Sequence, residues 1–450
     1  MYFNKKFLKK ISLNKLNVAK LSTGTIIGQL ITLLSLPFLT RIYGVETFGI
    51  WALVMAISMI MTSFTDLGMS YSMMEDKEST ISDNYKVIST ISVFLTFFLS
   101  GLLALLLVIF PNLILELSPI LFFLILSAYS FFSQQIQICY TWLNRTGEYG
   151  VLMKNPIVNA IVTNSFALIL GSLGYIQYGY FIGYLMGQLV TLINMKKQLP
   201  KGLLIFDYRK ILLVINKNKK YTSFQMPTNF LNNVKSQTMV LMINVFFGTQ
   251  MLGYYSLTMR ILQMPLTLLA KSIGRVFFKT VSDMKRRNEE LGKYVFVNLV
   301  RGMKLSILPI ALLMGLGDEL TVLIFGEKWR VTGELVQILS LQYFFMFLQS
   351  TMQGLSIVLN KQKNAMIVSF VHILSLVISV LIGSFFFDSI YIALTISTIL
   401  FILIQQVYFY TLFKEMDCLN KNYQVSMFKS TVMIGILAVV FKEVIIIINI

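Results

Sequence analysis

One apolar stretch, near residues 252–276, carries a series of polar and basic side chains on a single face. Their spacing of three or four residues places them on neighbouring turns of an α-helix. A cation in hydrocarbon costs at least about 2.5–3.5 kcal/mol on insertion scales, so the series predicts a watery cavity or a counter-ion. Basic side chains are also the usual ligands of phosphate groups. The members of the series are Arg260, Gln263, Thr267, Lys271 and Arg275.

A second set of charges extends this pattern. Arg301 and Lys304 lie on adjacent turns of the next apolar stretch, near 294–316. Acids are few by comparison, and Asp66, near the end of the stretch 49–72, is a candidate for ion coupling or for pairing with a base. Basic residues near a membrane surface can instead extend their charge to water, which is the alternative for Lys271 and Arg275. The excess of bases predicts a positive cavity that selects anionic cargo.

Two uncharged polar stripes recur at a fixed offset. Thr25, Gln29 and Thr32 share one helical face. The residues 204 positions later are also polar and also share one helical face, so they form a second stripe. Such groups can hold helices together, but the recurrence favours a shared cavity lining. The second stripe consists of Asn229, Asn233 and Ser236.

The same offset relates two glycine-containing turns. Gly44 and Gly49 correspond to Gly248 and Gly253, and an aromatic residue follows two places after each pair. Paired glycines permit a short hairpin between two membrane helices. A repeat at nearly half the chain length predicts two equivalent lobes, which in transporters usually face each other across a substrate path.

The composition indicates that these elements belong to a membrane protein. The chain has 450 residues, of which 56% are hydrophobic and 13% charged, and its mean hydropathy is +0.73. Soluble proteins carry about twice that share of charge. We therefore predict an all-α polytopic membrane protein with two six-helix lobes and a C-terminal hydrophobic segment. The expected spans lie near 21–40, 49–72, 87–110, 118–140, 156–175, 177–195, 222–246, 252–276, 294–316, 332–358, 364–387, 390–412 and 429–450.

The predicted organisation has five parts. They are a basic amphipathic N-terminus (1–20), an N-lobe (21–195), a cytoplasmic connector (196–220), a C-lobe (221–413) and a tail with a thirteenth span (414–450). Basic residues set the orientation of membrane proteins. With the N-terminus inside, 28 of the 38 Lys and Arg residues fall on inner segments and three on outer loops. This asymmetry predicts a cytoplasmic N-terminus and explains most of the net charge of +18 without a nucleic-acid partner.

The short loops and the missing motifs argue against catalysis. Every expected outer loop is short, whereas a membrane glycosyltransferase or polymerase needs a substantial loop domain. The sequence has no phosphate-binding glycine loop, no metal-binding Cys/His set and no nucleophile motif. We expect a transporter with no catalytic residue, no cofactor and no metal.

Three short segments resemble a known family. Pro37–Gly49, Asp66-Leu67-Gly68 and Leu323–Trp329 are similar to segments of the polysaccharide (O-antigen or capsule repeat-unit) flippases. These belong to the multidrug/oligosaccharidyl-lipid/polysaccharide exporter superfamily, whose members have 12 or 14 spans. The resemblance covers residues 1 to about 415, and the C-terminal end departs from both patterns.

The resemblance implies a cargo: an oligosaccharide on undecaprenyl pyrophosphate, moved from the inner to the outer leaflet of the bacterial cytoplasmic membrane. It also implies alternating access, contact with membrane lipids, and polysaccharide polymerase machinery as a further partner. Pyrophosphate suits the Arg and Lys residues, and sugar hydroxyls suit the Thr, Asn and Gln stripes. The alternatives are a drug/cation antiporter, a peptidoglycan-precursor flippase of the same superfamily, and a membrane polymerase or ligase.

Overall fold

The structure is a computed structural model, and every regular element in its described residues is a helix. It describes residues 2–75, 78–109, 118–200, 202, 204–416 and 421–448, with side chains from residue 22 onward except at 78–79, 421–423 and 446–448. Within these ranges ten helical segments are long and apolar enough to cross a membrane. The predicted all-α polytopic membrane protein is thereby confirmed. The apolar face expected on residues 1–20 lies outside the described side chains.

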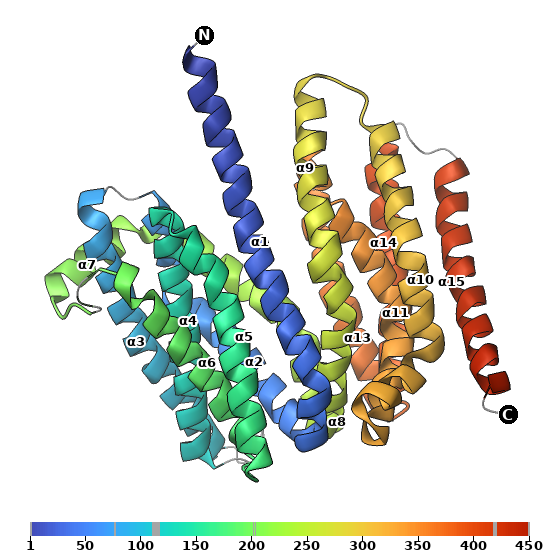
Figure 1. Cartoon of the computed structure of the whole chain (residues 1–450), viewed down its shortest axis with the longest axis horizontal. Coiled ribbons are helices and arrows are strands. Elements are labelled where there is room, and N and C mark those ends of the chain that lie inside the picture. The colour runs from blue at the N-terminus through green and yellow to red at the C-terminus, as the bar shows by residue number, and fades with distance from the viewer. Residues whose placement is uncertain are drawn as a thin grey trace. The chain divides into compact units, whose positions relative to one another are not determined.

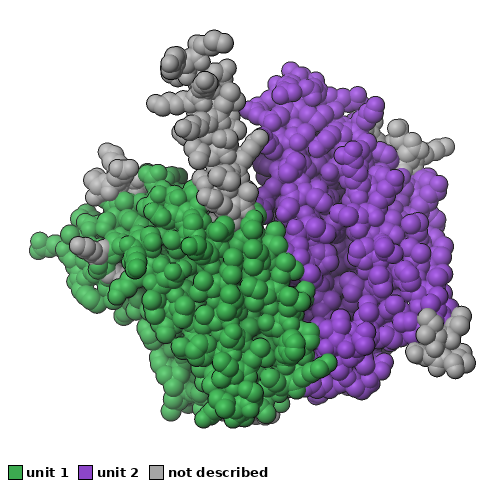
Figure 2. All heavy atoms as spheres, viewed as in Figure 1, with its two compact units in different colours: residues 1–237 green, residues 238–450 purple. Residues whose placement is uncertain are grey.

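Two compact units make up the chain, Met1–Gln237 and Thr238–Ile450 (Figure 2). The predicted lobes rest on the sequence repeat and stay a prediction. The first unit contains the elements that run from blue to green in Figure 1. They are α1 (Tyr2–Ile42), α2 (Val45–Thr65), η1 (Met69–Met74), α3 (Glu78–Ile109), α4 (Pro119–Thr146), α5 (Tyr149–Ser172), α6 (Gly179–Met195), η2 (Lys196–Gln198), α7 (Tyr208–Lys217), η3 (Tyr221–Gln225) and the start of α8 (Met226–Pro265).

Glycines determine how closely α5 packs with its neighbours α1 and α6. A Cβ atom on Gly24 of α1 would overlap the carbonyl oxygen of Met153, and one on Gly28 would lie 2.7 Å from that of Pro156. On α6, a Cβ on Gly183 would lie 2.6 Å from the backbone nitrogen of Ala167. Small residues four apart let membrane helices approach to backbone contact. The α1–α5–α6 layer is therefore held by close packing of backbones.

The connector between residues 196 and 220 contains the short helix α7. Asp207 caps it by accepting hydrogen bonds from the backbone N–H groups of Arg209 (3.0 Å) and Lys210 (3.3 Å). Val214 is buried against a cluster that includes Tyr85 and Leu143. The connector thus contains one short helix, and one face of that helix packs on the rest of the first unit.

The second unit begins within α8 and ends with α15. Gly248 interrupts α8 with a φ of 81° and a ψ of 172°, a conformation that glycine adopts at little cost. Two predicted spans therefore meet at one of the paired glycines, as expected. The remaining elements are η4 (Leu266–Ala270), α9 (Lys271–Arg286), α10 (Gly292–Phe325), η5 (Glu327–Trp329), α11 (Arg330–Thr351), α12 (Leu355–Val358), α13 (Gln362–Phe385), α14 (Ile390–Lys414) and α15 (Lys421–Ile448).

The last stretch is a single helix. It packs along α10, where the backbone of Ala438 lies against Gly315. Lys442 interacts electrostatically with Asp318 and Glu319 of α10. The charge that interrupts the apolar pattern of 429–450 therefore lies in the field of two acids on the neighbouring helix, and α15 continues through it without a break.

Candidate functional site

A polar cavity of about 310 Å³ lies inside the first unit, between α2, η1, α4 and the start of α8. All of its lining side chains are polar, and Asp66 is the one charged residue among them. The mixture of amides, hydroxyls and a carboxyl can form many hydrogen bonds to a neutral polyhydroxyl group. The lining consists of Thr62, Ser63, Asp66, Ser70, Tyr71, Gln134, Gln137, Thr141, Asn229, Asn232 and Asn233.

The turn after α2 places Asp66 at this cavity. Leu67 and Gly68 both have positive φ, 51° and 69°, and the Oδ1 atom of Asp66 accepts a hydrogen bond from the Gly68 N–H at 3.0 Å. A Cβ atom on Gly68 would lie 2.9 Å from the backbone nitrogen of Met226. Glycine is needed here because α8 begins directly against the turn. The Asp-Leu-Gly segment thus joins the end of α2 to α8.

Asn233 fixes α8 to α2 at the cavity wall. Its Nδ2 atom donates to the Met59 carbonyl oxygen and to the Ser63 hydroxyl, both at 2.8 Å. One turn earlier, Asn229 accepts from the Gln225 side chain at 2.9 Å. The structure therefore brings together three residues predicted from the sequence, Asp66, Asn229 and Asn233.

Asp66 is 5% exposed, and its carboxyl makes no ion pair with any described residue. Burial raises its pKa above the ordinary 3.8, while hydrogen bonds from Ser70 and from the Gly68 backbone act in the opposite direction. A buried carboxylate without a cationic partner favours a proton, a cation or a hydrogen-bonding ligand. Asp66 is thus a buried acid in the lining of the polar cavity.

The stripe on α1 and the end of the stripe on α8 lie apart from this lining. Thr25 and Gln29 are exposed within the first unit. The Thr32 hydroxyl donates to the Gly28 carbonyl oxygen at 3.1 Å and accepts from Asn164 of α5 at 3.5 Å. The exposed Ser236 donates to the carbonyl oxygen of Asn233 at 2.9 Å. Thr32 therefore contributes to helix packing, and a role of these four residues in cargo binding stays a prediction.

The predicted basic residues all lie in the second unit. Arg260 is half-buried on α8. Between Gln263 and Lys271 the helix changes to the π-helical turn η4. A π turn contains an extra residue, so the following positions are rotated from the face that an uninterrupted α-helix would give them. Four bases and the glutamine are exposed within this unit, namely Gln263 on α8, Lys271 and Arg275 on α9, and Arg301 and Lys304 on α10.

Sequence reasoning missed the contribution of α4. Gln134, Gln137 and Thr141 line the cavity, and their spacing of three and four residues puts them on one helical face. That periodicity was a usable signal. The described residues contain no group of three or more His, Cys, Asp or Glu side chains suited to a metal ion.

Comparisons with known proteins agree with these features. Residues 38–333 match the family model described as polysaccharide biosynthesis protein. A 122-residue segment is 24% identical to the teichuronic acid biosynthesis protein TuaB of Bacillus subtilis (strain 168), covering 27% of this chain and 25% of that relative. The matched part thus spans about a quarter of the relative's length.

Two solved structures share the fold over nearly the whole chain. One is the lipid II flippase MurJ in an inward closed conformation, with a TM-score of 0.68 and 15% identity over 95% of this chain and 99% of that one. The other is an inward-facing multidrug resistance MATE family transporter of the MOP superfamily, with a TM-score of 0.54 and 11% identity over 89% and 98%. At these identities the likeness concerns the fold.

Proposed function

The chain belongs to the family of polysaccharide biosynthesis proteins, and from that premise we propose that it is a flippase for lipid-linked oligosaccharides. Its cargo is an oligosaccharide repeat unit on undecaprenyl pyrophosphate, carried from the cytoplasmic to the outer leaflet of the bacterial inner membrane. The product serves surface polysaccharide synthesis, such as O-antigen or capsule. The observation that carries this proposal is the polar cavity around Asp66, Asn229 and Asn233 inside a membrane protein.

The cavity chemistry supports binding of the sugar part. Amide and hydroxyl side chains donate and accept hydrogen bonds without imposing a charge, and the exposed ring of Tyr71 can lie against a sugar face. The pyrophosphate is assigned to the bases of the second unit, with Arg260, Arg301 and Lys304 as its principal ligands. Lys271, Arg275 and Gln263 are proposed to contact the pyrophosphate as it moves toward these ligands.

The transport cycle is alternating access by the two lobes, with the glycine turns and the connector as flexible points. An anion moving outward gains about 2.3 kcal/mol per charge per 100 mV from an inside-negative potential. Asp66 is the candidate group for a coupled ion, because its buried carboxyl can exchange a proton or a cation. The gene product that polymerises the exported units is the expected functional partner.

A protein with this fold could instead transport one of two other cargoes. The peptidoglycan precursor is supported by the likeness to a lipid II flippase, and a cationic drug by the likeness to a multidrug transporter. A drug antiporter needs acids to hold a cationic cargo, whereas the charges predicted for the site are mostly basic.

A deletion strain distinguishes these functions. Loss of a polysaccharide flippase is expected to leave lipid-linked oligosaccharide on the inner leaflet and to remove surface polysaccharide, with drug susceptibility unchanged. Thin-layer chromatography of labelled lipid extracts measures the first effect, and complementation by the intact gene is the control. Raised drug susceptibility with normal lipid-linked sugar would replace the proposal by the antiporter, and accumulated lipid II would replace it by the peptidoglycan function.

The orientation gives a further expected result. With the N-terminus inside, Ser282→Cys near the end of α9 lies in the cytoplasm and Thr249→Cys lies at the outer face. A membrane-impermeant maleimide applied to intact cells is expected to label residue 249 and to leave residue 282 unlabelled until the cells are opened. Labelling of residue 282 from outside would reverse the orientation.

A further inference from the structure

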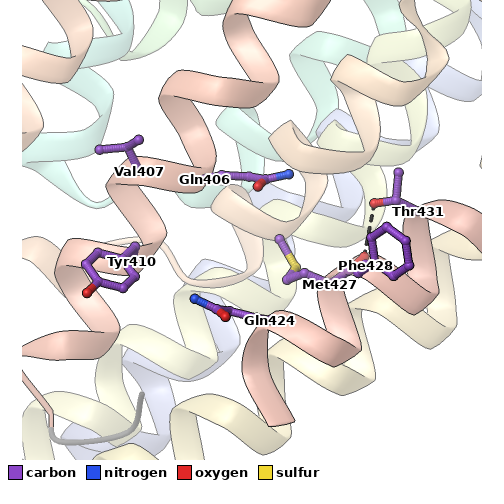
Figure 3. Close-up of a pocket in the computed structure, with 7 residues that line it drawn as sticks. All are labelled: Gln406, Val407, Tyr410, Gln424, Met427, Phe428 and Thr431. Atoms are coloured by element: carbon purple, nitrogen blue, oxygen red, sulfur yellow. Dashed lines mark hydrogen bonds between the residues drawn. The ribbon is translucent and has the colours of Figure 1, made fainter. Parts of the chain in front are cut away.

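An amphipathic groove separates α14 from α15 in the second unit (Figure 3). It exists because α15 packs along α10 and leaves a space of about 450 Å³ on its α14 side. That volume falls within the roughly 300–1,000 Å³ of small-molecule sites. Among the lining residues are Gln406, Val407 and Tyr410 of α14, and Gln424, Met427 and Phe428 of α15.

Two side-chain amides in the groove have no partner in the described part of the chain. Gln406 and Gln424 are both exposed and make no hydrogen bond to a described residue. Thr431, in contrast, donates to the Met427 carbonyl oxygen at 3.0 Å (Figure 3). An amide that lacks a hydrogen bond in hydrocarbon is unfavourable by several kcal/mol. The groove therefore calls for a ligand with hydrogen-bond acceptors.

The two amides lie toward the same ends of α14 and α15, at different distances from those ends. Gln406 precedes Lys414, the last residue of α14, by eight positions, or about 12 Å of helix. Since the hydrocarbon core is about 30 Å thick, Gln406 lies within the leaflet at the Lys414 end of α14. Gln424 lies three positions, or about 4.5 Å of helix, after Lys421, the first residue of α15. Both amides thus lie in the halves of α14 and α15 that are nearer to these helix ends.

The remaining groups fit an acyl chain and an anionic headgroup. Val407 and Phe428 are 63% and 71% exposed and present apolar surface to the groove. Lys414 is exposed and follows Gln406 and Tyr410 at four-residue intervals, so it shares their face. The neighbouring Glu415 is paired with Lys361 at 2.9 Å, which offsets its negative charge near Lys414.

We propose that this groove binds an anionic glycerophospholipid of the surrounding membrane. The ester carbonyl oxygens accept hydrogen bonds from the amides of Gln406 and Gln424, the phosphate lies near Lys414, and an acyl chain covers Val407 and Phe428. Polyprenyl phosphates have no ester carbonyl groups, so the amides favour a glycerolipid over the cargo's own lipid. The bound lipid fills the space between α14 and α15, and the proposal does not depend on which cargo the protein moves.

Native mass spectrometry of the purified full chain in detergent tests the site with added phosphatidylglycerol or phosphatidylcholine. The double variant Gln406→Leu/Gln424→Leu is expected to bind phosphatidylglycerol about tenfold more weakly, because two hydrogen bonds are lost. Lys414→Gln is expected to reduce the preference for phosphatidylglycerol over phosphatidylcholine about fivefold. Matched controls outside the groove, Gln250→Leu/Gln362→Leu and Lys285→Gln, replace exposed residues and should bind as the parent does.

A third variant, Val407→Trp, keeps both amides and fills the groove, so it should also lose bound lipid. Circular dichroism and size-exclusion profiles confirm that each variant is folded. Phosphatidylglycerol binding that is unchanged in both the double leucine variant and Val407→Trp would overturn the proposal. Displacement of phosphatidylglycerol by an equimolar polyprenyl phosphate, with the same dependence on Gln406 and Gln424, would assign the groove to the cargo's tail and also overturn it.

Discussion

Replacing Arg260 or Arg301 by alanine is expected to reduce export of lipid-linked oligosaccharide by about 10- to 100-fold at normal protein levels. A hydrogen bond to a charged group contributes about 1.5–3 kcal/mol, and each arginine is proposed to make such bonds to the pyrophosphate. Arg260→Lys should keep part of the activity, because it retains the charge and loses the planar two-pronged contact. Surface polysaccharide, measured against membrane protein by immunoblot, reports the effect.

The matched control is Lys285→Ala, which removes an exposed base at the far end of α9. It should export normally, since a general loss of positive charge is not the proposed cause. Full export by both alanine variants would exclude these arginines from the cargo site. A severe defect in the alanine and lysine variants alike would indicate that geometry at residue 260, and not charge alone, determines binding.

Asp66→Asn is expected to lower export at least about tenfold while making the folded protein more stable near neutral pH. Asparagine keeps an oxygen that can accept the Gly68 N–H, so the turn after α2 is preserved. It removes the carboxylate of a residue that is 5% exposed, and burial disfavours the charge of that group. Transport in proteoliposomes and thermal unfolding of the purified protein measure the two effects separately.

The pH dependence follows from the direction of the shift. Because burial raises the folded-state pKa of Asp66 above the ordinary 3.8, the folded state holds its proton more tightly than the unfolded state. The stability from this group is complete below that ordinary value and is lost as the pH rises through the raised folded-state pKa. The melting temperature of Asp66→Asn should lack this decline. An equal decline in the parent and in Asp66→Asn would contradict the assignment, and Asp83→Asn, at an exposed acid, is the control.

The helices of this protein were predictable because each apolar stretch has membrane length and ends at polar or glycine-rich turns. The kink at Gly248 was predictable from its pairing with Gly44, and its φ of 81° is a conformation that glycine favours. In the polar cavity, Asp66, Asn229 and Asn233 were identified because polar groups stand out in an apolar sequence. These signals are local, so the sequence alone contains them.

The features that could not be predicted from the sequence depend on which helices pack together. Gln134 and Gln137 of α4 become cavity residues only because α4 lies beside α2 and the start of α8. The π turn at Leu266–Ala270 shifts the helical face of Lys271 and Arg275, and counting at a constant angle cannot detect it. The acids whose electrostatic field reaches Lys442 lie on α10, more than a hundred positions earlier. Each of these features is decided by tertiary contacts between distant segments.

The packing of α1 on α5 also has a consequence for membrane insertion. Gly28 and its contact Pro156 are 128 positions apart, and ribosomes add about 5–20 residues per second. The first helix therefore exists for about 6–25 s before its partner is synthesised, and during that time Thr32 lacks the hydrogen bond from Asn164 of α5. During that interval we expect α1 to be bound by an insertase or a chaperone in the bilayer. Biogenesis of this protein should thus depend on such a factor more strongly before residue 156 emerges than after it.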